Sequence, residues 1–286
     1  MFGFLNILKP KGMTSHDVIS RLRKILQIKQ IGHSGTLDPL ASGVLPVGIG
    51  KATRLLEYLS DKKVYIVTLE FGKISDTLDT EGNVEFYSSK KVTQIDLNPV
   101  LSNFIGKITQ IPPAHSAVHY KGKRLYELAR KGIIPDDIPS REVFVEYIKL
   151  ISFDENTQVA SLEISCSKGT YIRSIVRDIG DILAVGAVMT DLVRINSSDF
   201  IIADSITLSP TLTKEEILNR LINPVDVLLY SQKTLTDDEL IKVKNGSSID
   251  NSEFDEDETV HLVYGGKLAA IARVSNNFIK VNKVFI

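Results

Sequence analysis

Apolar and polar residues follow two different periods along the chain, which predicts both helices and strands. A stripe at helical spacing runs through residues 15–28, where Thr14 or Ser15 would cap the helix. A second helix is predicted after Thr170, which would cap it; its buried positions are Ile172, Ile175, Val176, Ile179, Ile182 and Leu183. Residues 52–59 and 95–105 carry shorter helical patterns.

Other segments alternate with the period of a β-strand. Residues 64–71 place Tyr65 on the more apolar side, so we expect its ring to face the interior or a pocket. Residues 141–153 and 158–167 alternate in the same way. Helices and strands mixed in this order are compatible with an α+β protein.

The last third of the chain predicts two capped helices and a small β unit. Thr213 with Glu216, and Thr236 with Glu239, have the spacing of capping boxes. Strands at 259–264 and 267–274 flank Gly265-Gly266, a strong hairpin signal, and a last strand covers 278–285. We expect two domains, at residues 1–230 and 231–286.

Composition narrows the class of protein. The chain has 286 residues, 43% of them apolar, and its apolar runs are too short to span a membrane. The N-terminus lacks the pattern of a signal peptide, and a single cysteine excludes an internal disulfide. We therefore expect a cytoplasmic protein. Cys166 lies on the apolar side of an alternating run, which favours a core position over a reactive thiol.

The net charge of −1 does not by itself suggest a nucleic-acid partner, but its distribution is uneven. Residues 1–60 carry eight Lys/Arg against three acids, whereas residues 236–258 carry nine acids against two lysines. A basic face with acidity segregated elsewhere can bind phosphates. Ordinary solvated charge explains the acidic segment equally well.

One carboxylate stands in an unusual loop. In residues 32–54, GHSGTLDPLASGVLPVGIGKATR, Asp38 follows Gly35-Thr36-Leu37 and precedes Pro39. Glycines permit close approach by another molecule and proline stiffens the loop, so Asp38 has the setting of a reactive group on a rigid support. The alternative is an ordinary turn aspartate that caps local amides.

Two further segments have candidate chemistry. Residues 111–131 open on Pro112-Pro113 and interleave basic side chains with His119, Tyr120 and Tyr126, a pattern suited to phosphate contact and base stacking. A basic surface helix is the alternative. Arg173 falls in the first turn of its predicted helix, where a cation opposes the helix dipole unless an anion lies nearby. An exposed arginine without a partner is the alternative there.

Several common sites are absent from the sequence. Gly50-Lys51-Ala52-Thr53 resembles part of a phosphate-binding loop but lacks its first glycine and the Ser/Thr after the lysine. The five histidines and one cysteine show no metal-ligand spacing. We therefore predict neither a nucleotide cofactor nor a metal.

The loop that carries Asp38 closely resembles the catalytic motif of the TruB family of tRNA pseudouridine synthases. Four further segments resemble motifs of that family in the expected order: residues 6–15 (NILKPKGMTS), 122–130 (GKRLYELAR), 166–173 (CSKGTYIR) and 192–194 (LVR). The chain departs from the family at Val193, where arginine is frequent. The resemblance implies an α+β pseudouridine synthase fold around a mixed, largely antiparallel sheet, with Asp38 in a cleft across it. It also implies a PUA-like C-terminal domain.

The resemblance also implies roles for individual residues. Asp38 would be the essential acid, Arg173 would keep it ionised and oriented, and Tyr65 would stack on the extruded uracil. Leu192 would form an apolar pocket wall, and His33 would enter the RNA loop, although an isolated histidine is more often satisfied by local backbone. The remaining substrate-binding residues expected are Lys9, Tyr171, Lys123, Arg124 and Tyr126.

The implied substrate is the uridine at position 55 in the T-loop of tRNA, which must flip out of the folded arm. We expect a monomer with no cofactor, no membrane partner and no obligatory protein partner. One rival is a dyskerin-type synthase in a guide-RNA particle, which usually has extra terminal segments; the start of this chain, close to its first motif, favours a stand-alone enzyme. The other rival is an RNA-binding or tRNA-folding protein in which Asp38 is structural.

Overall fold

A computed structural model describes residues 2–286. A long ten-stranded sheet forms the main body, in the order β14-β1-β3-β12-β4-β11-β10-β7, with β2 beside β3 and β13 beside β12. Only the β1–β14 and β12–β3 pairs in this sheet are parallel. Its strands are β1 (Gly3–Lys9), β2 (Ile31–His33), β3 (Ser42–Ile49), β4 (Lys63–Phe71), β7 (Gly106–Gln110), β10 (Arg141–Asp154), β11 (Val159–Cys166), β12 (Ala187–Ser197), β13 (Phe200–Ile201) and β14 (Ile206–Thr207).

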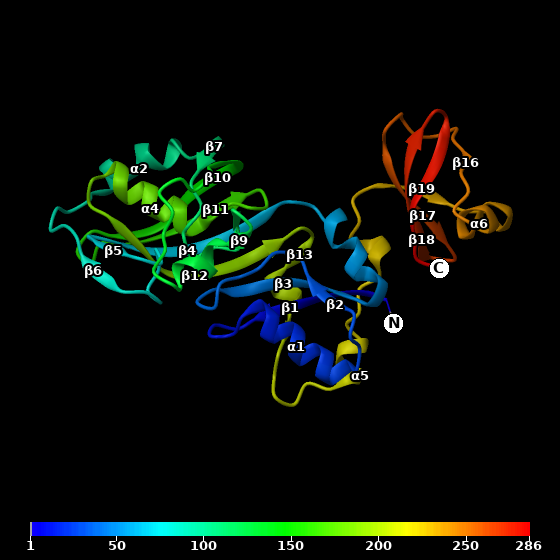
Figure 1. The fold of residues 1–286 in the computed structure, drawn as a ribbon, viewed down its shortest axis with the longest axis horizontal. Coiled ribbons are helices and arrows are strands. Elements are labelled where there is room, and N and C mark those ends of the chain that lie inside the picture. The colour runs from blue at the N-terminus through cyan, green and yellow to red at the C-terminus, as the bar shows by residue number, and fades with distance from the viewer. Residues whose placement is uncertain (1) are drawn as a thin grey trace.

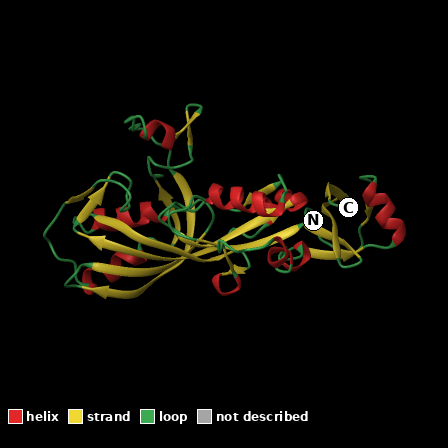
Figure 2. Cartoon of the chain, turned by 90° about the horizontal axis from the view of Figure 1, so that it is seen from below, coloured by secondary structure: helices red, strands yellow, loops and turns green. Residues whose placement is uncertain are grey.

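Helices cover the two ends of this sheet and bury two separate cores. Toward one end lie α2 (Gln94–Ser102) and α4 (Ile172–Ile182), and toward the other lie α1 (Ser15–Leu26) and α5 (Lys214–Leu218) (Figures 1 and 2). The first core contains Val67, Leu69 and Ile175, and the second contains Leu5, Val18 and Leu22. The predicted α+β fold with a mixed, largely antiparallel sheet is confirmed.

Local chemistry explains where α1 begins and ends. Thr14 caps it: its hydroxyl accepts from the Asp17 amide at 3.1 Å, and its own amide donates to Asp17 at 2.8 Å. The helix ends at Leu26 because Gln27 adopts a left-handed conformation with φ of 58°. It therefore stops two residues before the predicted end at Ile28.

A second, five-stranded sheet follows at the C-terminus in the order β15-β17-β18-β19-β16, with α6 (Asp237–Lys244) packed on it. Gly265 and Gly266 have φ of 56° and 73° and form the predicted hairpin turn, because both positions require positive φ. The strands are β15 (Ser231–Thr234), β16 (Ile249–Asp250), β17 (Thr259–Tyr264), β18 (Lys267–Ser275) and β19 (Phe278–Val284). The domain boundary at residue 230 stays a prediction.

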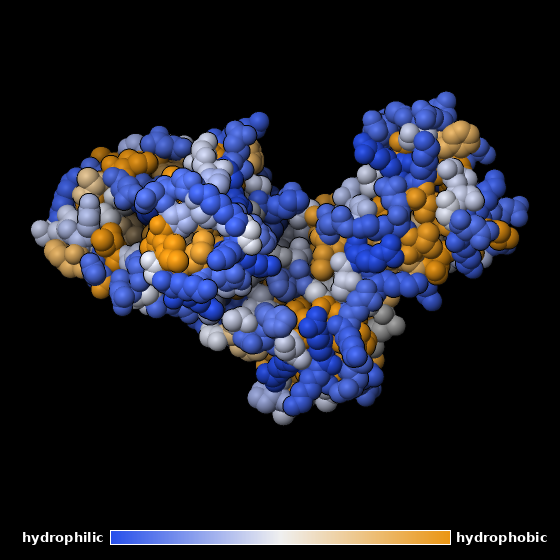
Figure 3. All heavy atoms as spheres, viewed as in Figure 1, coloured by the Kyte–Doolittle hydropathy of each residue, from blue (hydrophilic) through white to orange (hydrophobic). Residues whose placement is uncertain are grey.

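The C-terminal sheet contacts the main body through the last residues of the chain. Phe285 stacks on Phe2 with ring centroids 5.5 Å apart, and its carbonyl accepts from Lys51 at 2.7 Å. Lys51 belongs to η1 (Gly50–Tyr58), a 3₁₀ helix in the segment predicted to be a short helix. On the face drawn in Figure 3, a wide notch separates the C-terminal lobe from the far end of the main body.

Several sequence predictions were wrong in detail. Tyr171, not Thr170, is the N-cap of α4, and the Thr170 hydroxyl donates to the Ser167 carbonyl at 2.9 Å instead. Ile182 is 53% exposed because α4 ends there. In residues 111–131 the alternative interpretation, a basic surface helix, does not describe the segment: it holds the hairpin of β8 (His119–Tyr120) and β9 (Lys123–Arg124), then the single turn α3 (Leu125–Ala129).

Four short elements complete the fold. β5 (Lys73–Ser75) and β6 (Val84–Phe86) form a hairpin, η2 covers Ile202–Asp204, and η3 covers Pro224–Asp226. Within residues 2–286, none of the helices has both the length and the apolar content needed to cross a bilayer.

Candidate active site

Asp38 lies in the loop between β2 and β3, and this loop is tied to the N-terminal segment. The Ser15 hydroxyl accepts from the Leu37 amide at 2.9 Å, and the Pro39 carbonyl accepts from the Gly12 amide at 2.9 Å. Leu37 is buried next to Asp38, whose own side chain is 34% exposed. The loop therefore presents a partly exposed carboxylate on an anchored backbone.

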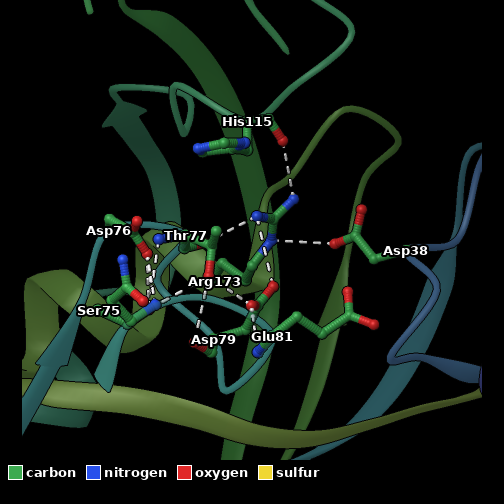
Figure 4. A network of polar contacts seen from close by, with 9 residues as sticks. Asp38, Ser75, Asp76, Thr77, Asp79, Glu81, His115 and Arg173 are labelled. Atoms are coloured by element: carbon green, nitrogen blue, oxygen red, sulfur yellow. Dashed lines mark hydrogen bonds and ion pairs between the residues drawn. The ribbon is translucent and has the colours of Figure 1, made fainter. Parts of the chain in front are cut away.

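Arg173 contacts this carboxylate from the first turn of α4. Its Nε atom lies 3.0 Å from Asp38 Oδ2, in an ion pair whose N–H is not aligned for a hydrogen bond. Its other nitrogens donate to the Thr77 carbonyl at 2.8 Å and to the His115 carbonyl at 3.1 Å (Figure 4). The structure thus contains the contact that the resemblance implied, and the arginine is only 5% exposed.

A second carboxylate, Asp79, lies on the other side of the same guanidinium. Its Oδ2 is 3.5 Å from Arg173 Nη1, and the residue is 2% exposed. Asp79 also accepts from the Thr77 hydroxyl at 2.6 Å and from the Glu81 amide at 3.0 Å. Burial and the Asp79 charge raise the pKa of the nearby Glu81 carboxyl. No motif in our sequence reasoning singled out Asp79.

Tyr65 and Leu192 line the sheet beneath the loop. They are 6% and 5% exposed, on the adjacent strands β4 and β12. Burial raises the pKa of the Tyr65 phenol, so the group is neutral at physiological pH. Tyr65 faces the interior, as the strand alternation predicted. Both side chains belong to the hydrophobic core that also contains Leu37, the residue before Asp38.

Arg194 and Lys63 are buried cations in this same region. Arg194 is fully buried and donates to the Val44 carbonyl at 2.7 Å and the Gly35 carbonyl at 3.1 Å. Lys63 is 8% exposed, and burial lowers its pKa to about 8. The sequence marked residues 192–194 as a motif but gave no sign that Arg194 would support the Asp38 loop.

Lys9 is buried rather than presented to solvent. Its ammonium donates to the carbonyls of Pro10, Met13 and Pro39, at 2.8, 2.6 and 3.4 Å. Burial lowers the pKa of Lys9 to about 8. These contacts indicate that Lys9 positions the Asp38 loop. The predicted direct contact of Lys9 with substrate stays a prediction, and the burial of Lys9 does not favour it.

His33 and Tyr171 lie on different elements, β2 and the start of α4. His33 ends β2, burial lowers its pKa, and its Nδ1 has no hydrogen-bond partner within residues 2–286. The local backbone therefore does not satisfy it. Tyr171 precedes α4, and its backbone exchanges two hydrogen bonds with the buried Gln110 side chain, at 2.8 and 3.0 Å.

The remaining residues predicted to bind the substrate lie in residues 111–131. Lys123 and Arg124 are exposed on β9, and Tyr126 is half-buried with Arg130 over its ring at 5.4 Å. A hollow of about 350 Å³ is lined by Tyr120, Lys121, Lys123, Leu128, Ile133 and Pro135. Another, of about 280 Å³, lies beside β1 and α5, away from Asp38. The predicted cleft at Asp38 stays a prediction.

The cysteine and the residue types that ligate metals can also be described. Cys166 is 3% exposed and burial raises the pKa of its thiol to about 11, so the core assignment is confirmed. Among residues 2–286, no three His, Cys, Asp or Glu side chains are grouped so that they could hold a metal ion.

Comparison with known families shows which family the chain belongs to. Residues 23–172 match the model described as TruB family pseudouridylate synthase (N terminal domain), and residues 173–230 match the tRNA pseudouridylate synthase B C-terminal domain. The chain belongs to the TruB family. It is therefore an enzyme, a pseudouridylate synthase, with the fold of that class.

Relatives of similar length support this membership in the TruB family. The protein named tRNA pseudouridine synthase B of Carboxydothermus hydrogenoformans is 40% identical, over 100% of this chain and 99% of the relative. Its namesake in Syntrophomonas wolfei is also 40% identical, over 96% and 94%. In Clostridium kluyveri the corresponding protein is 39% identical over the full length of both chains.

Solved structures share the fold of this TruB-family chain. A chain in the crystal structure of a Cbf5-Nop10-Gar1 complex superimposes with a TM-score of 0.74 and 25% identity, covering 100% of this chain and 85% of that one. A chain in an H/ACA RNP bound to a substrate RNA containing 2′-deoxyuridine gives a TM-score of 0.74 at 24% identity, with the same coverage.

Proposed function

We propose that this enzyme isomerises the uridine at position 55 in the T-loop of tRNA to pseudouridine. The names of relatives that span nearly its whole length support tRNA as the substrate. The resemblance of five separate motifs supports the T-loop position. A uridine inside a folded arm is inaccessible, so the nucleotide is flipped out at a cost of a few kcal/mol.

The reaction breaks the N1–C1′ bond, rotates the uracil and forms a C5–C1′ bond. The proton on C5 is lost and N1 gains one, so atoms and electrons balance without a redox partner or cofactor. A carboxylate can attack a glycosidic carbon or stabilise positive charge there. We assign this step to Asp38, on the strength of its ion pair with Arg173 and its partly exposed side chain.

Arg173 pairs with the Asp38 carboxylate and orients it, since its Nε atom lies 3.0 Å from Asp38 Oδ2. Tyr65 stacks on the extruded uracil, and Leu192 forms the apolar wall near it. The two lie on the adjacent strands β4 and β12, where Tyr65 is opposite Arg194 and Leu192 is opposite Val67. His33 occupies the RNA loop from which the base has swung out. Tyr171 contacts the nucleotide from the start of α4.

Lys123, Arg124 and Tyr126 hold the RNA backbone; the exposed position of Lys123 and Arg124 in a basic segment supports this, with the half-buried Tyr126 beside them. The C-terminal β-rich lobe, which we propose is PUA-like, gives a second grip on the RNA. We propose that the enzyme works in the cytoplasm as a monomer without an obligatory protein partner. Pseudouridine formation by the purified protein alone tests this against a guide-RNA particle.

Replacement of the acid separates catalysis from binding. Asp38→Asn should bind a T-arm hairpin RNA as tightly as the wild type and make no pseudouridine, measured by mass-tagged sequencing. Asp61→Asn is the matched control, because Asp61 pairs with Lys168 on the surface and should retain activity. Full activity of Asp38→Asn would refute the assignment and favour an RNA-binding protein with a structural aspartate.

A further inference from the structure

Within the described chain, the Arg141 guanidinium has an aromatic neighbour but neither an ion-pair nor a hydrogen-bond partner. Arg141 begins β10, is half-buried, and its guanidinium lies over the Tyr171 ring at 5.4 Å from the centroid. Within residues 2–286, no carboxylate lies at ion-pair distance from Arg141, and no hydrogen bond from its guanidinium is found. Stacking leaves the edge of the guanidinium, with its donors, free to bind something else.

Two other cations that lie over aromatic rings also pair with a carboxylate. Lys149 lies 4.5 Å from the Tyr147 ring centroid and pairs with Glu163 at 3.9 Å. Lys121 pairs with Asp137 at 3.6 Å. Arg130 lies over Tyr126 without a partner in the described chain, and it belongs to the segment that we propose covers the RNA. Arg130 and Arg141 thus share the property of a stacked guanidinium without a carboxylate partner among the described residues.

The position of Arg141 relative to Tyr171 is fixed by the sheet. Gln110 is opposite Arg141 in the β7–β10 pair, and the same Gln110 side chain holds the backbone of Tyr171 on both sides. Gln110 is 1% exposed, so this clamp is part of the packed interior. Arg141 and Tyr171 are therefore held in one rigid unit, and Tyr171 lies two residues before Arg173 along the chain.

A glycine keeps the free end of the guanidinium open. Gly169, with φ of 83°, lies next to Arg141, and a Cβ added there would be 3.7 Å from Arg141 Nη1. A longer side chain at residue 169 would extend across this nitrogen. The turn before α4 thus leaves Nη1 accessible beside the residue that meets the flipped nucleotide.

We propose that Arg141 is a further substrate-binding residue, which holds a backbone phosphate of the RNA strand next to the flipped uridine. This rests on the proposed function, since Tyr171 marks the place of that nucleotide. A planar guanidinium fork matches two phosphate oxygens, and stacking on Tyr171 fixes its plane before the RNA arrives. A neutral base edge would not require a charge left unpaired in the free protein.

The test removes single charges from both partners. A T-arm hairpin RNA is made with a neutral methylphosphonate at one linkage at a time near the target uridine. The affinity of each RNA is measured for the wild type, Arg141→Gln, Arg141→Lys and the control Lys149→Gln. Lys149 also lies on β10 and is stacked on a tyrosine ring, so this control loses a comparable cation. Arg141→Gln should weaken binding of the unmodified hairpin about tenfold and lower the slope of log affinity against log salt by about one.

One linkage should identify the contact. A methylphosphonate there should weaken binding to the wild type and to Lys149→Gln, but add no further loss in Arg141→Gln. Arg141→Lys keeps the charge without the fork, so it should show an intermediate loss at the same linkage. Thermal unfolding of each variant checks that the fold persists, and Arg141→Lys carries the test if Arg141→Gln unfolds.

Two results would overturn the proposal. Unchanged affinity of Arg141→Gln and Arg141→Lys would do so, as would equal losses at every linkage in Arg141→Gln and the wild type. Failure of the proposed function looks different: the wild type would make no pseudouridine at the target uridine of the hairpin, while the coupling between Arg141 and one linkage persisted.

Discussion

The Nε atom of Arg173 lies 3.0 Å from Oδ2 of Asp38, and the same guanidinium is 3.5 Å from a second, buried carboxylate on Asp79. One cation thus joins the Asp38 loop to the loop of residues 75–82. The hydrogen bond from Arg173 to the His115 carbonyl also connects the guanidinium to residues 111–131, the segment that we propose holds the RNA. Loss of this side chain should therefore disturb both charge and geometry at the site.

We predict that Arg173→Met destabilises the protein by about 3–5 kcal/mol, because it leaves Asp79 buried and unpaired. Arg173→Lys should be milder in stability, yet lose at least about a hundredfold in single-turnover rate, since one ammonium cannot reproduce a fork aimed at several oxygens. Urea titration gives the first value and quenched-flow kinetics the second.

The double variant Arg173→Met/Asp79→Asn is the control for this prediction. It removes the uncompensated buried charge, so it should recover much of the stability while activity stays low. Recovery of activity together with stability would show that Arg173 acts only as a structural residue.

A second prediction concerns the RNA-binding face. Charge reversal at Lys123 and Arg124 should weaken tRNA binding more than the same change at Lys242 and Lys244, which are also exposed but lie on α6 beside the acidic segment. Affinity of the wild type should fall steeply with salt, through counterion release. Filter binding at several salt concentrations checks both. The opposite ranking would mean that the C-terminal lobe carries the main RNA contact.

Burial of Lys63 predicts a change of stability with pH. Its pKa of about 8 in the folded protein lies below the value of 10.5 expected when unfolded. Below pH 8 both states hold the proton, so this group adds no pH dependence. Between pH 8 and 10.5 the unfolded state binds more protons, so the Lys63 contribution to stability should rise, by at most about 1.4 kcal/mol per pH unit.

Lys63→Met should lack this rise. The free energy of unfolding of the wild type minus that of Lys63→Met, measured by urea titration at several pH values, should become more positive as the pH rises from 8 to 10.5. A difference that stays constant across that range would show that the Lys63 ammonium is well solvated in the folded protein.

A fourth prediction uses a close approach of two strands. Gly43 has φ of 113°, and a Cβ there would lie 2.2 Å from the carbonyl oxygen of Arg194. We expect Gly43→Ala to cost more than about 3 kcal/mol or to prevent folding, because the neighbouring backbone of β12 cannot move aside. Gly106→Ala is the control: its φ is 94° but nothing lies within 4 Å of the added atom, so only about 1–3 kcal/mol of strain is expected. Equal losses would refute the steric argument.

Local signals in the sequence were sufficient for most elements. The capping boxes of α1, α5 and α6 and the Gly265-Gly266 hairpin involve residues within a few positions of each other, and all are present. The alternation in β4 and around Cys166 correctly placed side chains in the core. The prediction that Thr170 caps α4 was wrong because Thr170 and Tyr171 both precede the helix and the sequence does not distinguish them. The hydrogen bond between the Tyr171 amide and the Gln110 side chain, which is distant in sequence, fixes Tyr171 as the N-cap.

By itself the sequence determined the periodic elements, the lone carboxylate in its tight loop and, through resemblance, the family, because these depend on residues close together in the chain. Only the tertiary structure decided that Arg173 spans Asp38 and Asp79, that Lys9 is buried under the loop, and that Arg141 is left without a partner. These relationships join segments that are distant in sequence. The pattern of side chains along one segment does not specify which strand will lie beside it. Such contacts therefore become apparent only in the assembled sheet.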